Sequence, residues 1–297
     1  RPVLSSDSRS GKTPKWMKRL QIIDSTTITL FSNLLFKGVG RHPKSGKKKG
    51  GIKVHTVIHA NEGVPSDIKF TSAATNDSFM LKPTNPSKGD IVAMDRAYIN
   101  YEKFEHLTRR GVIYVTKLKK SLKYTIESDT MYQTPDGLME VRIQHVTFTK
   151  TIKTGETIHH HARIITYVDG QKHKLISLLT NDLEHDSAEI IAIYRQRWEI
   201  ELLFKQMKQN FPLKYFYGES ANAIKIQIWV TLIANLLLMV MQKGLTRKWC
   251  FSGLATIVRI TLMYYVDFCS LFNNPEKDWE NILSEASGAP PEPSLFD

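Results

Sequence analysis

The sequence predicts an α/β fold, in which helices flank a mixed β-sheet, a strand-rich insertion interrupts the sheet, and helices follow at the C-terminal end. Three observations predict it. Residues 20–118 alternate short runs of β-branched and apolar residues with one helical segment. Residues 119–186 change to short alternating segments separated by turn signals such as Thr134-Pro135-Asp136-Gly137. Residues 187–272 carry apolar residues at helical spacing.

The composition is that of a folded globular protein with a sizeable core, because 41% of its 297 residues are apolar and 24% are charged. We divide it into a connector at residues 1–19, a first core part at 20–118, the insertion at 119–186, a second core part at 187–272 and a loose tail at 273–297. The chain opens on Arg1 rather than methionine, so we expect a fragment that lacks an N-terminal region.

The net charge of +12 predicts a polyanionic partner. Nucleic acid is favoured over an anionic membrane, because no basic amphipathic helix is evident. A basic loop over residues 37–53 is expected to contact phosphates, although a solvated hairpin turn is the alternative. Its candidate contacts are Arg41, Lys44, Lys47, Lys48, Lys49 and Lys53. Two cysteines, Cys250 and Cys269, lie in apolar surroundings, which suits reduced thiols in a cytosolic protein.

The first core segment, Leu20 to Leu30, reads as a long strand with Asp24 inside it. A buried and unpaired aspartate is costly, so Asp24 requires a metal, another cation or hydrogen bonds. A simple turn with Ser25 is the alternative, and the apolar flanks argue against it. Residues 52–60 and 66–73 then predict two further strands of an antiparallel meander, and a short helix is expected through residues 77–81.

A second carboxylate ends a short apolar strand, because Asp95 follows Ile91-Val92-Ala93-Met94. An uninterrupted apolar strand indicates a central position buried on both faces. Ligands of α/β sheets collect at such strand ends, whereas the alternative role of Asp95 is to cap the next helix. That helix is predicted over residues 100–110, and another buried strand over 112–117.

The remaining elements are predicted from the same patterns. The insertion contains strands at residues 141–149, 157–168 and 173–180. His159, His160 and His161 alternate between the faces of one strand, so they cannot bind a single metal. Residues 223–241 are strongly apolar but interrupted by polar side chains, which favours a buried helix over a membrane span. A second apolar helix is expected at residues 254–272.

The helical run Ser187 to Asn210 carries a polar stripe beside an apolar one. At about 100° per residue, five polar side chains share one face over four turns: Tyr194, Arg197, Glu201, Lys205 and Lys208. An ordinary solvated face, with ion pairs worth a few tenths of a kcal/mol, is the alternative interpretation.

The spacing of Tyr194, Arg197, Glu201 and Lys208 resembles the Tyr-Arg-Glu-Lys signature of the DDE transposases of the insertion-sequence-four family. Asp24 in IIDST, Asp95 in DRAY, the basic loop and the insertion extend the resemblance over most of the chain. It implies an RNase H-like core in which Asp24, Asp95 and Glu201 bind two Mg²⁺ ions, with Mn²⁺ as the alternative metal.

The resemblance also implies the reaction, which is cleavage at the ends of a mobile element followed by attack of the freed 3′-hydroxyl on target DNA. Tyr194, Arg197 and Lys208 match signature positions that contact DNA phosphates. Relatives that form a hairpin intermediate stack a flipped base on a tryptophan of the insertion. No tryptophan occurs between Asp95 and Trp198 here, which leaves open the aromatics Tyr124, Tyr132 and Phe148.

The expected partners are DNA, a second copy of the chain in the DNA complex, and the replication sliding clamp, without a membrane. Leu295 and Phe296, behind a proline-rich approach, resemble short clamp-binding motifs, although they could pack on the body of the protein instead. The expected location is the bacterial cytoplasm, at the nucleoid. Two alternatives to a transposase stay open, a non-catalytic DNA-binding protein derived from one and a nuclease of the same fold.

Overall fold

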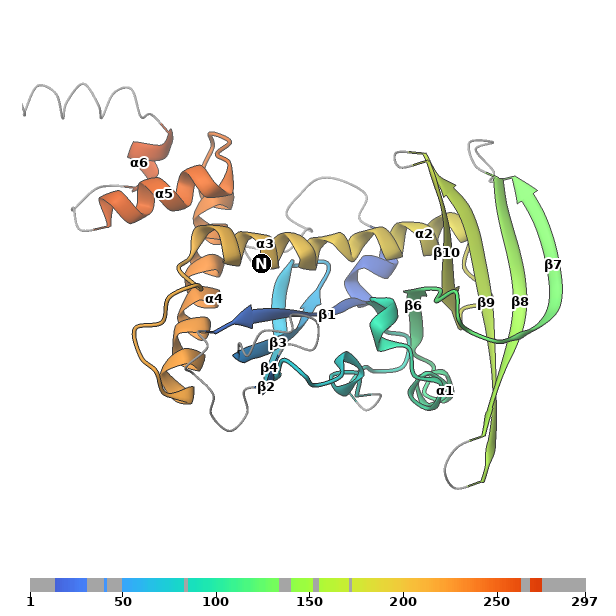
Figure 1. Ribbon diagram of the computed structural model, residues 1–297. Coiled ribbons are helices and arrows are strands. Elements are labelled where there is room, and N and C mark those ends of the chain that lie inside the picture. The colour runs from blue at the N-terminus through green and yellow to red at the C-terminus, as the bar shows by residue number, and fades with distance from the viewer. Residues whose placement is uncertain are drawn as a thin grey trace, which may run out of the picture. The chain divides into compact units, whose positions relative to one another are not determined.

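The computed structural model (Figure 1) describes residues 14–30, 40–41, 50–82, 85–133, 140–151, 155–170, 173–262 and 268–273. The chain divides into two compact units, which are described separately below. The first comprises Arg1–Lys205 and Leu213–Ile228, and the second Gln206–Pro212 and Trp229–Asp297.

A ten-stranded sheet spans the described part of the first unit. Five strands lie in the order β4-β3-β1-β5-β6. They are β1 (Leu20–Thr29), β3 (Gly50–His59), β4 (Val64–Ser72), β5 (Ile91–Met94) and β6 (Ile113–Lys117), and the two-residue β2 (Gly40–Arg41) pairs with β3. The strands β1, β3 and β4 form an antiparallel meander, whereas β5 is parallel to both β1 and β6. These elements confirm the predicted meander and central strands.

The strands of the insertion continue the same sheet. They are β7 (Thr125–Gln133), β8 (Glu140–Thr151), β9 (Thr157–Asp169) and β10 (Lys174–Thr180). The link is antiparallel pairing of β10 with β6, in which Leu178 lies opposite Lys117. The strand β7 was not predicted, because eight of its nine residues are exposed and it carries no buried apolar face.

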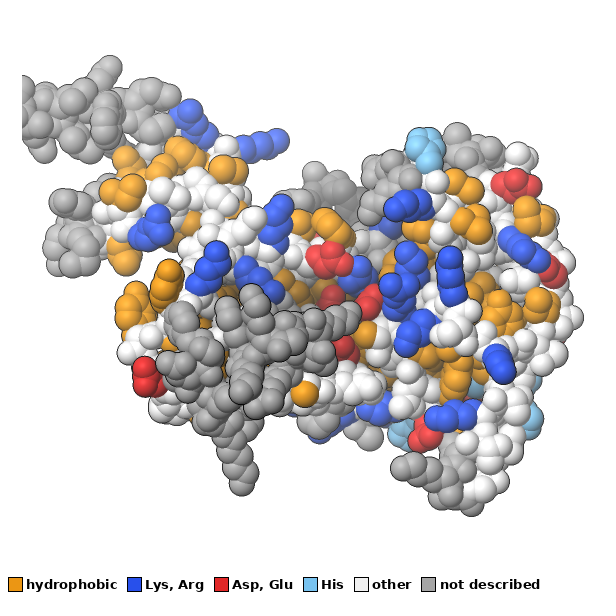
Figure 2. Space-filling view, viewed as in Figure 1, with side chains coloured by type: hydrophobic (Ala, Val, Ile, Leu, Met, Phe, Trp, Pro, Cys, Tyr) orange, Lys and Arg blue, Asp and Glu red, His pale blue; other side chains and the backbone are white. Residues whose placement is uncertain are grey.

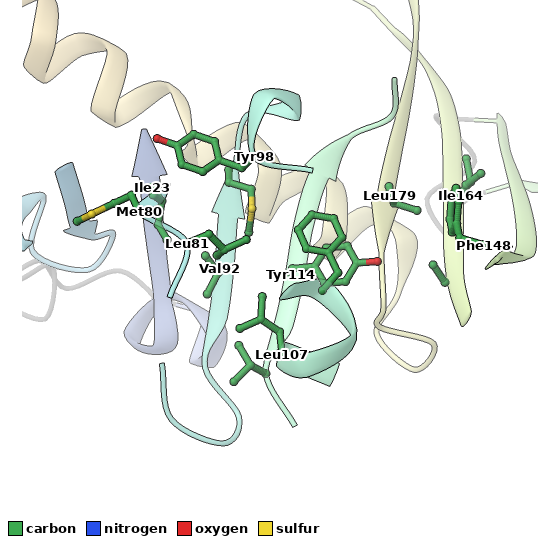
Figure 3. Close-up of a cluster of buried hydrophobic side chains, with 14 of the residues drawn as sticks. Ile23, Met80, Leu81, Val92, Tyr98, Leu107, Tyr114, Phe148, Ile164 and Leu179 are labelled. Carbon is green, nitrogen blue, oxygen red and sulfur yellow. The ribbon is translucent and has the colours of Figure 1, made fainter. Parts of the chain in front are cut away.

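Both faces of the central strands are covered. The four residues of β5 are all buried, as an apolar strand between two layers requires. The helix α1 (Tyr101–Arg109) packs against β6 and β9, and α2 (Ser187–Gln196) packs against β5 and β6 on the opposite side (Figure 1). On the α1 side, Ile23, Val92, Tyr98 and Leu107 belong to one buried cluster (Figure 3).

A buried polar chain joins α1, β6 and β9. The Tyr114 hydroxyl lies 2.7 Å from His160 Nε2, and His160 Nδ1 lies 2.9 Å from Glu105 Oε2. Burial lowers the pKa of His160, with Glu105 opposing that effect. His159 and His161 are exposed, so the predicted alternation of the three histidines between faces is confirmed.

The predicted helix Ser187–Asn210 is not continuous. The helix α2 ends at Gln196, and α3 runs from Trp198 to Asn210. At the junction the Arg197 amide donates to the Tyr194 carbonyl at 3.1 Å, three residues back, which is a 3₁₀-type bond. One tight turn therefore separates the two halves of the signature at Arg197.

The second unit is helical in its described part. It contains the end of α3, most of α4 (Ala221–Gly244), α5 (Phe251–Thr261) and α6 (Phe268–Asn273). Its buried cluster is formed by Leu238, Phe251, Leu254 and Phe272. The prediction of a single helix over residues 254–272 is wrong, because α5 ends at Thr261 and α6 begins at Phe268. Residues 263–267 between them lie outside the described part of the chain.

The helix α4 is long and apolar enough to cross a membrane by length and composition alone, although core helices of soluble proteins pass the same test. About one third (33%) of its most apolar stretch is buried. Leu232 and Asn235 are buried as predicted, whereas Val230, Ile233 and Leu237 are more than half exposed. One side of α4 is therefore buried, as predicted, whereas the other side is exposed in this structure.

Candidate active site

Strand register brings the first two predicted carboxylates together. Ile23 of β1 lies opposite Met94 of β5 in parallel pairing, and this is the last pair between the two strands. Asp24 directly follows this pair on β1, and Asp95 directly follows it on β5. Because paired strands lie about 4.8 Å apart, the two aspartates begin as neighbours at the point where β5 ends.

The carboxylate of Asp24 is mostly buried, with 18% of its side chain exposed, and both of its oxygens accept hydrogen bonds. Oδ1 accepts from the backbone amide of Ser25 at 2.8 Å. Oδ2 accepts from Nη1 of Arg197 at 3.1 Å. The cation that a buried aspartate requires is therefore provided here by a residue of the signature.

Arg197 also brings in the third carboxylate. Its Nη2 donates to Oε1 of Glu201, one helical turn later, while its Nη1 holds Asp24. The guanidinium lies 5.7 Å from the centre of the Tyr194 ring, in a cation–π contact. Its Nε is buried and has no hydrogen-bond partner among the residues that the structure describes. Three of the four signature residues thus contact one another around Asp24.

The electrostatics of the site link the same residues. Burial raises the pKa of Asp24 to about 6, against the opposing effects of the Ser25 amide and the Arg197 guanidinium. The negative charges of Asp95 and Glu201 raise this pKa further. Burial also raises the pKa of Tyr194, which the nearby guanidinium opposes. Asp95 and Glu201 therefore both lie within electrostatic reach of Asp24.

Asp95 also has the alternative role that was considered from the sequence, although for a different helix. Its Oδ2 accepts from the Ala97 amide at 3.4 Å and caps the 3₁₀ helix η4 (Arg96–Tyr98). The helix α1 is capped instead by Asn100, which accepts from the Lys103 amide at 3.1 Å. One long bond uses little of the acceptor capacity of a carboxylate.

The donor set suits a hard divalent cation such as Mg²⁺, which prefers carboxylate oxygens. Among the described residues, no three His, Cys, Asp or Glu side chains are already grouped closely enough to hold a metal. In this arrangement the guanidinium of Arg197 lies between Asp24 and Glu201. Burial, with smaller effects from the charges of Asp95 and Glu201, raises the pKa of Asp24, and the Arg197 guanidinium only partly opposes this, so a bound cation would favour the ionised carboxylate. The residues therefore fit a divalent cation, provided that Arg197 moves aside.

The basic residues predicted to contact DNA differ from one another in exposure and position. Lys53 is only 12% exposed, and its ammonium group pairs with Asp77 at 2.9 Å and donates to the Thr75 carbonyl at 2.7 Å. Lys208 is exposed on α3, within the second unit. The side chain of Arg41 lies outside the description, as do residues 42–49 with Lys44, Lys47, Lys48 and Lys49.

Three exposed cations that the sequence reasoning did not single out lie near the same strand ends. Arg96 directly follows β5, and Lys119 and Lys120 follow β6 after one intervening residue. Because β5 and β6 are parallel, their carboxyl ends share one edge of the sheet. Figure 2 shows several Lys and Arg side chains beside the acidic side chains near the middle of one face. The sequence carries no pattern around these three residues that would have identified them as a group.

The aromatic alternatives for base stacking differ in accessibility. Phe148 is 1% exposed and packs against Tyr101, with ring centres 5.1 Å apart, so it cannot receive a base. Tyr124 packs edge-on against Phe148 at 5.4 Å. The hydroxyl of Tyr132 donates to Asp186 at 2.9 Å. Only Tyr124 and Tyr132 keep part of their surface exposed.

The family profile described as "Transposase DDE domain" matches residues 15–237, a range that contains Asp24, Asp95, Arg197 and Glu201. This chain belongs to the DDE transposase family. The predicted resemblance is confirmed, and the DDE domain implies an RNase H-like core for this transposase chain.

Three curated transposases are similar to it. "Putative transposase y4zB" of Sinorhizobium fredii is 28% identical over 221 residues, which cover 74% of this chain and 60% of that protein. "Probable transposase for insertion sequence element IS5377" of Geobacillus stearothermophilus is 25% identical over 287 residues, 96% of this chain and 71% of that protein. "Putative transposase for insertion sequence element IS4SA" of Synechocystis is 26% identical over 224 residues, 73% of this chain and 58% of that protein. The transposase chain thus spans between 58% and 71% of the length of these relatives.

Proposed function

We propose that this chain catalyses metal-dependent DNA transposition, cleaving DNA at the ends of a mobile element and joining the freed 3′ ends to target DNA. The observation that supports the proposal is the position of Asp24, which neighbours Asp95 at the point where β5 ends and is linked to Glu201 through Arg197. Asp24 and Asp95 directly follow the last residue pair of the parallel strands β1 and β5. Family membership supports the same reaction.

The proposal includes an RNase H-like core made of residues 20–118 and 187–272. The strand order β4-β3-β1-β5-β6, with an antiparallel meander followed by two parallel strands, supports it. Residues 119–186 are the insertion, residues 1–19 a connector and residues 273–297 a tail.

In this mechanism Asp24, Asp95 and Glu201 would hold two Mg²⁺ ions, with Mn²⁺ as a substitute. When bound, such ions activate the attacking oxygen and stabilise the leaving oxygen of an in-line phosphoryl displacement. Arg197, once released from the carboxylates, presents a planar pair of donors that fits a phosphate in bidentate fashion. Tyr194 keeps the guanidinium against its ring, 5.7 Å from its centre. We assign DNA phosphate contacts to Tyr194, Arg197 and Lys208.

The remaining basic residues bind the DNA backbone through charge. We assign this role to Arg41, Lys44, Lys47, Lys48 and Lys49 of the basic loop, and we add Arg96, Lys119 and Lys120, which are exposed near the ends of β5 and β6. Phosphate contacts of this kind release counterions, so binding should weaken steeply with salt.

The proposed partners follow from the reaction. Two element ends require two active sites, so a homodimer assembles with DNA. Leu295 and Phe296, which lie outside the described residues, dock the tail on the replication sliding clamp. The proposed location is the bacterial cytoplasm, at the nucleoid.

The test is cleavage and strand transfer by the full chain on DNA that carries the ends of its element, with Mg²⁺ or Mn²⁺. We expect the wild type to perform both steps, and variants Asp24→Asn, Asp95→Asn and Glu201→Gln to bind DNA without cleaving it. Cleavage that persists in Asp95→Asn would show that the wrong residue was assigned. Cleavage without strand transfer would favour a nuclease, and metal-independent binding with no cleavage would favour a non-catalytic DNA-binding protein.

A further inference from the structure

A fourth carboxylate lies beside the site, on a residue that belongs to neither the signature nor the strand ends. Asp77, in the 3₁₀ helix η3 (Asp77–Phe79), accepts a hydrogen bond at Oδ1 from the Ser25 hydroxyl at 2.5 Å. The same oxygen lies 2.9 Å from the ammonium of Lys53 in β3. Ser25 directly follows Asp24 in β1. The side-chain contacts thus join three separate elements next to the first catalytic aspartate.

The segment that carries Asp77 is fixed independently of Ser25. Its N-terminal end is capped by Asn76, which accepts from the Ser78 amide at 3.0 Å. Met80 and Leu81 anchor the following residues in the buried cluster (Figure 3), with 2% and 0% exposure. Lys103 of α1 also donates to the Ser78 carbonyl. Because these contacts fix the segment that carries Asp77, its carboxylate provides an immobile acceptor for the Ser25 hydroxyl.

The strand needs such a restraint at this point. The pairing of β1 with β5 stops at Ile23, whereas its pairing with β3 continues from Asp24 to Thr29. Among the described residues, β1 therefore has sheet hydrogen bonds on one edge only from Asp24 onward. A strand bonded on one edge is freer to shift than one bonded on both.

The hydrogen bond between Ser25 and Asp77 lies on the face of β1 opposite the one that Arg197 contacts. Successive residues of a strand point to opposite faces, so Ser25 shares the face of Ile23, next to Met80 and Leu81. Asp24 points to the other face, where Arg197 binds it. Since the Ser25 amide also donates to Asp24 Oδ1 at 2.8 Å, fixing Ser25 fixes the orientation of that carboxylate.

We propose that Asp77 is a positioning residue for the metal-binding carboxylate of Asp24, acting through the Ser25 hydroxyl, with Lys53 neutralising its charge. The proposal rests on the function proposed above, because it assumes that Asp24 binds a metal. Lys53 pairs with the Asp77 carboxylate at 2.9 Å, so Asp77 can accept the Ser25 hydrogen bond without leaving its own charge uncompensated. The role of Lys53 is therefore to pair with Asp77 rather than to contact DNA.

The experiment measures Mn²⁺ affinity by calorimetry and steady-state DNA cleavage, both on the full chain. Ser25→Ala removes the hydroxyl, Ser25→Thr keeps it, and Asp77→Asn removes the charge. The matched control is Asp67→Asn, which breaks an ion pair with Lys69 at 3.2 Å on β4, away from Ser25. We expect Ser25→Ala and Asp77→Asn to weaken Mn²⁺ binding and lower kcat by about 10-fold to 100-fold, as loss of a group that orients a metal ligand does.

The DNA KM should stay within about twofold of the wild-type value, since the change affects the reacting centre and not DNA affinity. Ser25→Thr should restore binding and kcat, and Asp67→Asn should change neither. Wild-type Mn²⁺ affinity and kcat in both Ser25→Ala and Asp77→Asn would overturn the proposal, as would a Ser25→Thr variant as impaired as Ser25→Ala. In either case Asp24-dependent Mn²⁺ binding by the wild type would leave the proposed function standing. If the wild type shows no Mn²⁺ binding that Asp24→Asn abolishes, both inferences fail together.

Discussion

Replacing Asp24 with Asn should stabilise the metal-free protein while it abolishes cleavage. In the folded chain, burial and the charges of Asp95 and Glu201 raise the pKa of Asp24 from 3.8 to about 6, even though Arg197 and the Ser25 amide oppose them. The ionised carboxylate is therefore less favourable in the folded than in the unfolded chain. Asn keeps the shape of the side chain and removes that ionisation.

The sign and size follow from proton linkage. Below about pH 3.8 the carboxyl is protonated in both states and contributes nothing to the pH dependence. Between about pH 4 and 6 only the unfolded chain releases the proton, so stability falls as the pH rises. Above pH 6 the full penalty applies, and the difference between the two pKa values sets a ceiling of about 3 kcal/mol. We expect Asp24→Asn to gain about 1 to 3 kcal/mol at pH 7.5 in the absence of metal.

Urea unfolding in EDTA, at pH 7.5 and near pH 3.5, measures this gain. The difference in unfolding free energy between Asp24→Asn and wild type should be positive at pH 7.5 and should shrink toward zero at the lower pH. Glu156→Gln, at an exposed position, removes a carboxylate as a control and should leave stability nearly unchanged. Adding Mg²⁺ should stabilise the wild type only. An Asp24→Asn variant that is less stable than the wild type at pH 7.5 in EDTA would refute this reasoning.

Three further predictions concern other parts of the chain. Glu201→Gln should lose cleavage while DNA binding, measured by fluorescence anisotropy, stays within about threefold of wild type, since we assign its carboxylate to the reacting centre; a parallel loss of DNA binding would contradict this. Replacing Lys47, Lys48 and Lys49 together with Gln should flatten the slope of log affinity against log salt by about 1 to 3, and an unchanged slope would show that the basic loop does not touch DNA. His160→Phe should lower the unfolding free energy by about 1 to 3 kcal/mol, because it leaves a buried tyrosine hydroxyl without its partner; a neutral effect in thermal unfolding would show that water replaces the imidazole.

Much of the fold, and the strand positions of Asp24 and Asp95, could be predicted from local sequence patterns. Asp24 and Asp95 each interrupt or end a run of apolar, β-branched residues, and this places a carboxylate at a strand position without reference to the rest of the fold. Glu201 was singled out because its spacing from Tyr194, Arg197 and Lys208 resembles the family signature, since the helical stripe alone is also typical of a solvated face. The parallel register that makes the two aspartates neighbours is a tertiary property, and no single strand encodes it.

The residues that the sequence did not reveal act through contacts between distant segments. Asp77 reads as an ordinary helix-start residue until Ser25 and Lys53 are seen to bind its carboxylate. Lys53 looks like one more cation of a basic loop, although its side chain is mostly buried and pairs with Asp77. The tight turn at Arg197 also could not be predicted. An amphipathic stripe predicts a helix, but it does not reveal where an amide donates to the carbonyl three residues back instead of four.

The pairing of β10 with β6 has a consequence for any attempt to shorten this chain. The strand β6 is bonded to β5 on one edge and to β10 on the other. Excising the insertion would leave the backbone amides and carbonyls of β6 open along a short apolar strand, which is a template for pairing with other chains. We therefore expect trimmed versions that keep the three carboxylates but drop residues 119–186 to accumulate as aggregates. The insertion thus protects the edge of β6 permanently, and β10, which pairs directly with β6, matters more for this protection than the outer strands β7 and β8.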